Sequence, residues 1–243
     1  MKIDVHFSPS SIDELSLKEK VCIVIDVLRA TSSIATAFSN GAKEVFPVNT
    51  VAEAGKIASN TFGGIVLAGE KNGVIIEGFH LGNSPSEYTE EKVKNKTVVF
   101  TSTNGSNAIL KTRFAKISLL ASFLNIGKVS NFLVEKNSDF TIICAGKNNL
   151  FCVEDTVCAG MIISFISETI DVELTDSAVA ALVLYKNFGH NILDTLKNCE
   201  HGNFLCEIGF ENDLTVCSSC DLLSVIPIYS NNSIKNFERK DNL

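Results

Sequence analysis

Residues 21–33 read Val21-Cys-Ile-Val-Ile-Asp26-Val-Leu-Arg29-Ala-Thr31-Ser32-Ser33, and this stretch decides the fold. Its five leading apolar residues, mostly β-branched, predict a strand that is buried on both faces. Asp26 and Arg29 follow within a few residues of the end of that strand. Because open α/β sheets bind their ligands beyond the carboxyl ends of the strands, we expect an active site here, with Asp26 and Arg29 as catalytic candidates.

Hydroxyl side chains follow this strand exit and precede an apolar helical stripe. Thr31, Ser32 and Ser33 are N-cap candidates, because such side chains accept hydrogen bonds from the unpaired N–H groups of a first helical turn. The stripe closes at Asn40-Gly41, a typical helix end. Since a helix N-terminus carries a partial positive charge, we predict that the three hydroxyl residues help to bind an anion such as phosphate.

The composition favours a globular protein with a small-molecule partner. With 243 residues, 45% of them hydrophobic, the chain can fill one large α/β domain or two closely packed subdomains. Its net charge of -7, without a Lys/Arg cluster longer than two residues, argues against a nucleic-acid partner. No run approaches the roughly 20 apolar residues of a membrane span, and residues 1–10 lack the apolar region of a signal peptide. We expect a cytoplasmic protein without a membrane partner, and assembly into a homo-oligomer stays open.

Strand and helix patterns alternate along most of the chain. This rhythm predicts an α/β fold with a mostly parallel sheet and right-handed crossovers. The strand-turn-helix arrangement of residues 24–40 recurs at 97–111, which leaves two similar subdomains as an option. No long linker is visible, so we place one domain at residues 1–229, with a weak division near 120. Residues 230–243, rich in Asn and charge, are predicted to be a frayed tail.

Two further strand exits carry dense polar sets, at residues 101–106 and 146–155. We expect them to converge with the exit at 26–33, because the carboxyl ends of parallel strands share one edge of the sheet. The first exit could donate side-chain and backbone N–H groups to an anionic substrate, or it could simply be a helix cap with a tight glycine turn. The candidate residues there are Thr103, Asn104, Gly105 and Ser106.

Residues 78–88 hold glycines, an asparagine and a proline. The segment is too irregular for a regular element and too apolar for a solvated linker, so we expect a structured loop that forms a wall of the pocket. Asn83 is its substrate-binding candidate. His80 could act as a general acid, although a lone histidine in a loop more often has no such role.

Four carboxylates are candidate ligands for Mg²⁺, which prefers oxygen ligands and retains waters beside a phosphorylated substrate. They are Asp26, Glu70, Glu154 and Asp155. Between Asn148 and Tyr185 the chain has six acids and no Lys, Arg or His, which favours a metal role for the last two. Acids at a helix start also interact with the helix dipole, and Glu70 also fits a solvated turn, so these alternatives stay open.

Arg29 is the strongest candidate for binding phosphate. The chain has only two other arginines, Arg113 and Arg239, so arginine is not its usual surface cation. The planar guanidinium can bind phosphate or carboxylate through two hydrogen bonds at once. A structural ion pair with Asp26 or another acid is the alternative.

The eight cysteines are expected to be free thiols, because disulfide scaffolds are typical of small, loop-rich secreted chains. One cluster could in principle bind zinc, although its irregular spacing makes the signal weak. Its members are Cys199, His201, Cys206, Cys217 and Cys220.

Five motifs in order, covering most of the chain, resemble the 2-phosphosulfolactate phosphatase (ComB) family. They are Asp26-Val-Leu-Arg-Ala-Thr-Ser33, Gly69-Glu70, Gly78-Phe-His-Leu-Gly-Asn-Ser-Pro85, Thr103-Asn-Gly-Ser106 and Ala145-Gly146 with Glu154-Asp155. The resemblance implies a three-layer α/β/α fold and a magnesium-dependent acid phosphatase that acts on phosphosulfolactate in coenzyme M biosynthesis. The family commonly has Asp where His80 stands and Thr where Ser106 stands.

The leading hypothesis is a Mg²⁺-dependent phosphomonoesterase that acts on a small anionic 2-hydroxy acid. The attacking group would be a metal-activated water or an aspartyl nucleophile. A non-catalytic protein that binds a phosphorylated or sulfonated metabolite, and another metal-dependent reaction on a similar substrate, are the alternatives.

Overall fold

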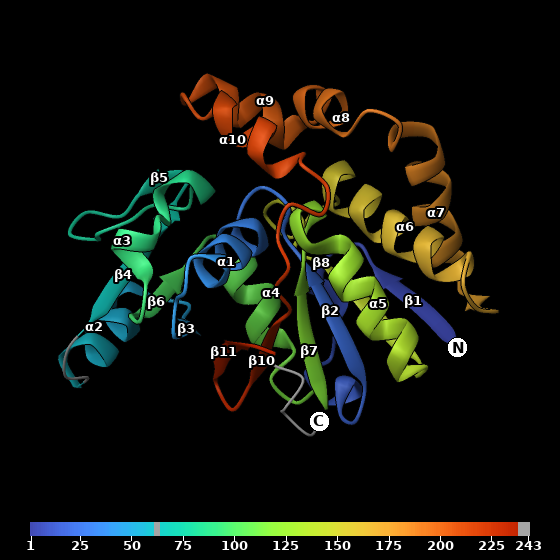
Figure 1. Ribbon diagram of the computed structural model, residues 1–243, viewed down its shortest axis with the longest axis horizontal. Helices are drawn as coiled ribbons and strands as arrows, with labels where there is room; N and C mark the ends of the chain where they lie inside the picture. Colours follow the sequence, from blue (N-terminus) through green and yellow to red (C-terminus); the bar gives the residue numbers. More distant parts are fainter. Residues whose placement is uncertain (61–63, 238–243) are drawn as a thin grey trace.

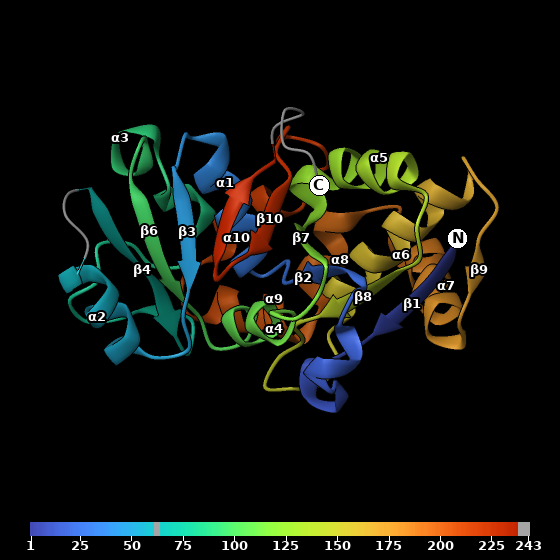
Figure 2. The same ribbon diagram turned by 90° about the horizontal axis from the view of Figure 1, so that it is seen from below.

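The computed structural model describes residues 1–60 and 64–237 and confirms an α/β fold, with helices on both faces of one mostly parallel sheet (Figure 1, Figure 2). The strands are β1 (Lys2–His6), β2 (Val21–Ile25), β3 (Glu44–Pro47), β4 (Ile65–Lys71), β5 (Val74–Ile75), β6 (Thr97–Thr101), β7 (Ile117–Ala121), β8 (Phe140–Cys144), β9 (Glu173–Leu174), β10 (Pro227–Ser230) and β11 (Ser233–Asn236). The α-helices are α1 (Ala30–Ser39), α2 (Val51–Asn60), α3 (Glu90–Val93), α4 (Gly105–Lys111), α5 (Ile126–Lys136), α6 (Val153–Ser167), α7 (Asp176–Phe188), α8 (Ile192–Asn198), α9 (Glu200–Glu207) and α10 (Glu211–Cys217).

Within residues 1–60 and 64–237, the sheet has 11 strands in the order β5-β4-β6-β3-β11-β10-β7-β2-β8-β1-β9. Strands β4, β6 and β3 form one parallel block, and β7, β2, β8, β1 and β9 form another. In the second block β2 lies between β7 and β8, and every one of its residues is buried. The prediction that residues 21–25 form a strand covered on both faces is therefore confirmed.

The C-terminal hairpin of β10 and β11 joins the two parallel blocks. β11 pairs antiparallel with β3, and β10 pairs antiparallel with β7. Ile234 is fully buried in this hairpin. The prediction of a frayed tail from residue 230 is wrong as far as Asn236, because backbone pairing on both sides and burial hold the segment in place. Residues 238–243 lie outside the described residues, and the division near residue 120 stays a prediction.

Successive residues of β2 point to opposite faces of the sheet, as strand geometry requires. Ile23 and Ile25 pack in a core with α5, α6 and α7, whereas Val24 packs in a second core with α1 and α4. Each fully buried aliphatic side chain contributes about 1.5–3 kcal/mol. This burial holds β2 between two helical layers, so its polar exit lies at the edge of the sheet.

Helices α8, α9 and α10 follow α7 and lie above α1 and α6 in Figure 1. We call residues 192–217 the helical cover. Leu196, Leu205 and Leu214 are buried in the same core as α5, α6 and α7, which anchors the cover to the rest of the fold. Within the described ranges, no helix has the length and apolar character needed to cross a bilayer.

Candidate active site

The strand exits and the helical cover enclose a cavity of about 260 Å³. The exits of β2, β6 and β8, which were predicted to converge, all contribute to it, together with the end of β4 and with α9. The residues that line it are Asp26, Leu28, Arg29, Glu70, Asn72, Gly73, Asn83, Thr103, Asn104, Lys147, Asn148, His201, Phe204 and Leu205.

Asp26 is buried directly after β2. Its Oδ1 accepts a hydrogen bond from the Ala30 N–H at 3.1 Å. Gly105 packs so closely that a Cβ at this position would lie 2.6 Å from Asp26 Oδ2, so the close approach of α4 requires glycine. Burial, together with the charges of Glu70 and Glu154, raises the pKa of Asp26 to about 6, although His201 and the Ala30 N–H act to lower it. The negative charge gathered here would favour a bound cation.

The three hydroxyl residues after Arg29 lie inside the first turn of α1 rather than at its cap. Arg29 itself holds the N-cap position, without a side-chain cap hydrogen bond. The hydroxyls of Thr31, Ser32 and Ser33 donate to the carbonyl oxygens of Asp26, Val27 and Asn83 at 2.8, 2.8 and 2.7 Å, respectively. The capping prediction is wrong because the β2–α1 connection brings carbonyl oxygens within reach of these hydroxyls. None of the three lines the cavity, so their substrate-binding role stays a prediction.

Arg29 lines the cavity and forms a buried ion pair with Asp213 of the helical cover. Its Nη1 lies 2.6 Å from Asp213 Oδ2, and the two side chains are 2% and 4% exposed. Nη2 donates to the Gly73 carbonyl at 2.8 Å, and the guanidinium lies 4.1 Å from the centroid of the Phe210 ring. The ion-pair alternative therefore holds, with Asp213 and not Asp26 as the partner. A guanidinium has five N–H donors, so donors remain for a ligand.

Glu70 joins the exits of β4 and β6. Its Oε2 accepts the Gly73 N–H at 2.6 Å, and its Oε1 accepts the Thr103 N–H at 2.6 Å. The Thr103 hydroxyl donates to Oε2 at 3.1 Å. Glu70 is buried, so the alternative of a solvated turn carboxylate is wrong. These contacts fix a carboxylate in the cavity wall.

The other polar candidates differ in what they face. Asn104 Oδ1 accepts the Asn148 N–H at 2.9 Å, which ties the exits of β6 and β8 together. Ser106 is fully buried and exchanges hydrogen bonds with Ser102, so it stabilises its own turn. Asn83 lines the cavity, and its buried Oδ1 has no hydrogen-bond partner. Asn83 and Asn104 thus face the cavity, whereas Ser106 does not.

Asp155 is buried and does not line the cavity. Its two carboxylate oxygens accept the backbone N–H groups of Val27 and Gly146 at 2.9 and 3.0 Å. Burial, followed by the charges of Glu154 and Asp26, raises the pKa of Asp155 well above its ordinary value. These contacts indicate that Asp155 holds the exits of β2 and β8 together. Its role as a metal ligand stays a prediction, because its side chain does not line the cavity.

Glu154, the neighbour of Asp155, is also buried but faces a different partner. Its Oε1 lies 3.1 Å from Nδ1 of His201 in the helical cover. Burial alone would raise the pKa of Glu154, but the hydrogen bond and charge of His201 outweigh it and lower that pKa below its ordinary value. Two adjacent acids at the start of α6 therefore have different surroundings.

Two functional candidates were missed from the sequence, Lys147 and Asp213, and His201 was considered only as a member of the weak zinc cluster. Lys147 contacts Glu200, with 3.2 Å between Nζ and Oε1, and lies above the Phe204 ring. Its position in a polar strand exit was a usable signal. Asp213 had no local signal, and nothing in the sequence indicated that His201 pairs with Glu154, because both residues reach the site only through the packing of the cover.

The remaining sequence candidates lie elsewhere. His80 accepts the Leu67 N–H through Nδ1 at 3.0 Å and does not line the cavity. All eight cysteines are free thiols, as predicted. Among the described residues, the cysteines of 199–220 do not gather with His201 into a metal-binding group. His201 is instead close to Cys152 and Glu154.

Comparison with known proteins identifies the family. A family model described as 2-phosphosulpholactate phosphatase matches residues 6–232. A protein from Clostridium novyi (strain NT) is 40% identical over 227 residues, which cover 93% of this chain and 96% of that protein. Proteins from Caldanaerobacter subterraneus and Clostridium acetobutylicum are each 40% identical, over 239 and 235 residues. These alignments cover 97% and 96% of this chain and 98% and 100% of the two relatives, respectively.

All three relatives are described as probable 2-phosphosulfolactate phosphatases. The family model and the relatives point to the same family as the resemblance of the five motifs. The family model spans the strand exits and the helical cover, so its match includes every element of the cavity. The chain belongs to the 2-phosphosulfolactate phosphatase family.

Proposed function

We propose that the protein hydrolyses 2-phosphosulfolactate to sulfolactate and phosphate in this cavity, with Mg²⁺ as its cofactor. The observation that carries the proposal is the set of charges that line one cavity: the carboxylates Asp26 and Glu70 and the cations Arg29 and Lys147. The cavity of about 260 Å³ is smaller than the roughly 300–1,000 Å³ typical of drug-sized ligands, which suits a small substrate.

The cations of the cavity suit a substrate with several anionic groups. 2-Phosphosulfolactate carries a phosphate, a sulfonate and a carboxylate. Arg29 is held in one orientation by Asp213 and Gly73, so its free donors are positioned before a ligand arrives. Lys147 supplies a second positive charge from the exit of β8. We assign these two residues to the anionic groups of the substrate.

The oxygen donors of the cavity fit Mg²⁺. Asp26 and Glu70 supply carboxylates, and the unpartnered Oδ1 of Asn83 supplies a neutral oxygen, which is the donor chemistry that this cation prefers. The raised pKa of Asp26 reflects burial beside other carboxylates, a cost that a divalent cation would relieve. When bound, Mg²⁺ would neutralise charge on the phosphoryl oxygens and lower the pKa of a water.

Asp26 is the residue we assign to the attacking water. Its carboxylate lines the cavity directly after β2, where it can accept a hydrogen bond from a water. Arg29 and Lys147 hold the phosphate so that the water attacks phosphorus opposite the ester oxygen. Direct attack by Asp26 on phosphorus, with sulfolactate as the leaving group, is the second route. Rapid acid quench of a turnover with substrate labelled in its phosphorus distinguishes the two, since only this route places the phosphoryl group on the protein before water releases it as phosphate.

Phosphate release from 2-phosphosulfolactate tests the proposal directly. The wild-type protein should release phosphate, chelation should abolish the activity, and added Mg²⁺ should restore it. Asp26→Asn should lose activity, whereas the exposed control Asp171→Asn should not. Binding of the substrate without phosphate release would favour the non-catalytic alternative, and full activity after chelation would exclude the metal requirement.

A cytoplasmic location is also part of the proposal. Eight free thiols suit a reducing compartment, because disulfides form and persist in oxidising ones.

A further inference from the structure

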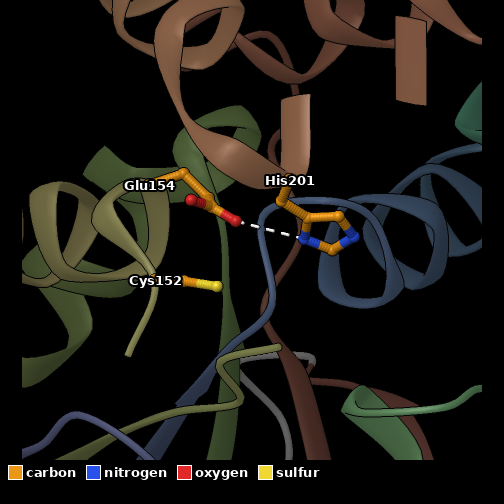
Figure 3. Close-up of side chains that lie close together, drawn as sticks. All are labelled: Cys152, Glu154 and His201. Atoms are coloured by element: carbon orange, nitrogen blue, oxygen red, sulfur yellow. Dashed lines mark hydrogen bonds and ion pairs between the residues drawn. The ribbon is translucent and has the colours of Figure 1, made fainter. Parts of the chain in front are cut away.

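Cys152, Glu154 and His201 bring a thiol, a carboxylate and an imidazole together beside the proposed active site (Figure 3). One ligand atom from each lies within 4.8 Å of the other two. The proposed phosphatase chemistry does not use the sulfur. The group therefore requires a separate explanation.

The three side chains come from two rigid elements. Cys152 is the N-cap residue of α6 and Glu154 lies in the first turn of the same helix, whereas His201 comes from α9. Cys152 and Glu154 are buried, and His201 is partly buried. Ligands on packed helices lose little freedom when an ion binds, so the arrangement is already close to a binding geometry.

A second cavity of about 170 Å³ opens beside the three ligand atoms and gives an ion and a water room to enter. His201 lines both cavities, so the two sites are neighbours but have different donor sets. The residues that line the second cavity are Lys147, Asn148, Leu150, Phe151, Cys152, Val153, Glu154, Glu200 and His201.

The distance between two of the donors matches the geometry of a shared ion. Nδ1 of His201 and Oε1 of Glu154 are 3.1 Å apart. Two ligands at about 2.0 Å from a tetrahedral Zn²⁺ lie roughly 3.3 Å from each other. Three protein ligands with an open fourth position are the common pattern of an accessible zinc site.

The donor chemistry separates this group from the Mg²⁺ ligands that we propose. A thiolate is a soft ligand that selects Zn²⁺ and related cations, whereas Mg²⁺ prefers oxygen. A thiolate and a carboxylate together carry two negative charges, which one divalent cation neutralises. We propose that Cys152, Glu154 and His201 bind Zn²⁺ at a site distinct from the position at Asp26 and Glu70.

The binding step is a ligand exchange that conserves charge and atoms. Burial and the charges of Glu154 and Asp155 raise the pKa of the Cys152 thiol, so its proton passes to water as the sulfur lone pair bonds to Zn²⁺. Neutral His201 donates the lone pair of one ring nitrogen, and the carboxylate of Glu154 donates an oxygen. No oxidant or reductant takes part.

Co²⁺, a spectroscopic substitute for Zn²⁺, tests the site in the metal-free, fully reduced, full-length protein. We expect a thiolate-to-cobalt charge-transfer band in the near ultraviolet, and we expect stoichiometric Zn²⁺ to abolish it. Cys152→Ser should remove the band and weaken metal binding by at least about 10-fold, the lower end of what losing even an outer partner costs. The absence of a band in the wild-type protein would overturn the proposal.

Two controls separate this site from other thiols and from the Mg²⁺ position. Cys220→Ser removes the exposed thiol and should leave the band unchanged. Glu70→Gln removes a proposed Mg²⁺ ligand and should also leave it unchanged. Loss of the band in Cys220→Ser, or its persistence in Cys152→Ser, would assign the metal to another thiol. If Cys152→Ser does not fold, judged by circular dichroism, His201→Gln and Glu154→Gln replace it. Both should keep the sulfur but weaken Co²⁺ binding about 10-fold or more, and unchanged affinity in both would overturn the proposal.

Discussion

The strand exits and the helical cover face each other across the cavity, but their polar groups behave differently. At the strand exits most polar groups satisfy one another: hydroxyls of α1 reach carbonyl oxygens, and Glu70 and Asp155 accept backbone N–H groups. In the cover, two polar side chains contact residues of the strand exits or of α6 on the other side of the cavity. Asp213 pairs with Arg29, and His201 pairs with Glu154.

The strand exits therefore stabilise one edge of the cavity by themselves, whereas the charged residues of the site need the helical cover. The strand exits are held by short-range hydrogen bonds and by buried apolar strands. The buried charges Arg29 and Glu154 acquire partners only when the cover packs, and an unpaired buried charge is costly. Substitutions of the charged residues that contact the cover should therefore lower stability and activity most, and substitutions of the hydroxyl residues should lower them least.

Arg29→Ala should have the largest effect, because it removes the group that joins both regions and leaves Asp213 buried without its partner. We expect the free energy of unfolding to fall by about 4 kcal/mol and kcat/KM for 2-phosphosulfolactate to fall by roughly 10³-fold in the fraction that remains folded. Chemical denaturation and phosphate release measure the two effects. Arg113→Ala, at an arginine that is 51% exposed, is the matched control and should change neither by much. An unchanged kcat/KM in Arg29→Ala would remove the anion-binding role.

Asp213→Ala tests the same contact from the side of the cover. It leaves the Arg29 charge and the Ser84 hydroxyl without their partner, so we expect a loss of about 3 kcal/mol in unfolding free energy. Because Arg29 itself is retained, kcat/KM should fall less than in Arg29→Ala. The double variant should be more stable than the sum of the single losses predicts, since the two residues share one interaction. Additive losses would show that the pair is not coupled.

The pH dependence of stability tests the charge gathered at the strand exits. The pKa of Asp26 is about 6 in the folded state and near 3.8 in the unfolded state, so the folded protein binds this proton more tightly. In metal-free protein, stability from this group is fully present below about pH 4 and is lost as pH rises to about 6, by about 2–3 kcal/mol. The difference in unfolding free energy between wild type and Asp26→Asn should change over this window. A difference that is constant between pH 4 and 7 would contradict the raised pKa.

Asp155→Ala should weaken the edge itself rather than its link to the cover. The change leaves the buried N–H groups of Val27 and Gly146 without acceptors, at about 1–3 kcal/mol each, partly offset by removal of a buried charge. We expect a net loss of about 2 kcal/mol in unfolding free energy. Asp171→Ala, at an exposed acid, should stay within about 0.5 kcal/mol of the wild type. A stable Asp155→Ala protein that no longer binds Mg²⁺ would instead support a metal role.

Ser33→Ala should have the smallest effect. Its hydroxyl donates to the Asn83 carbonyl and does not line the cavity, so we expect a loss of about 1 kcal/mol in stability. The same measurement of phosphate release should give kcat/KM within about twofold of the wild type. A large loss of kcat/KM at unchanged stability would instead support the predicted role of Ser33 in substrate binding.

The sequence predicted the strand exits well because their signals are local. Five apolar residues followed by Asp26 identify a buried strand and its polar exit. The hydroxyls after Arg29 were misread for the same reason. Their type favours a cap, but their actual acceptors depend on the turn and on a loop 50 residues away.

By itself, the sequence determined the alternation of buried strands and helices and the polar exits, because side-chain periodicity and turn residues act over a few positions. The tertiary structure alone decided which partner each buried charge acquired. Asp213 lies 184 positions from Arg29, and His201 lies 47 positions from Glu154. It also decided that the last two strands fill the centre of the sheet. Contacts at such separations depend on how apolar faces pack together, and no local sequence pattern indicates that packing.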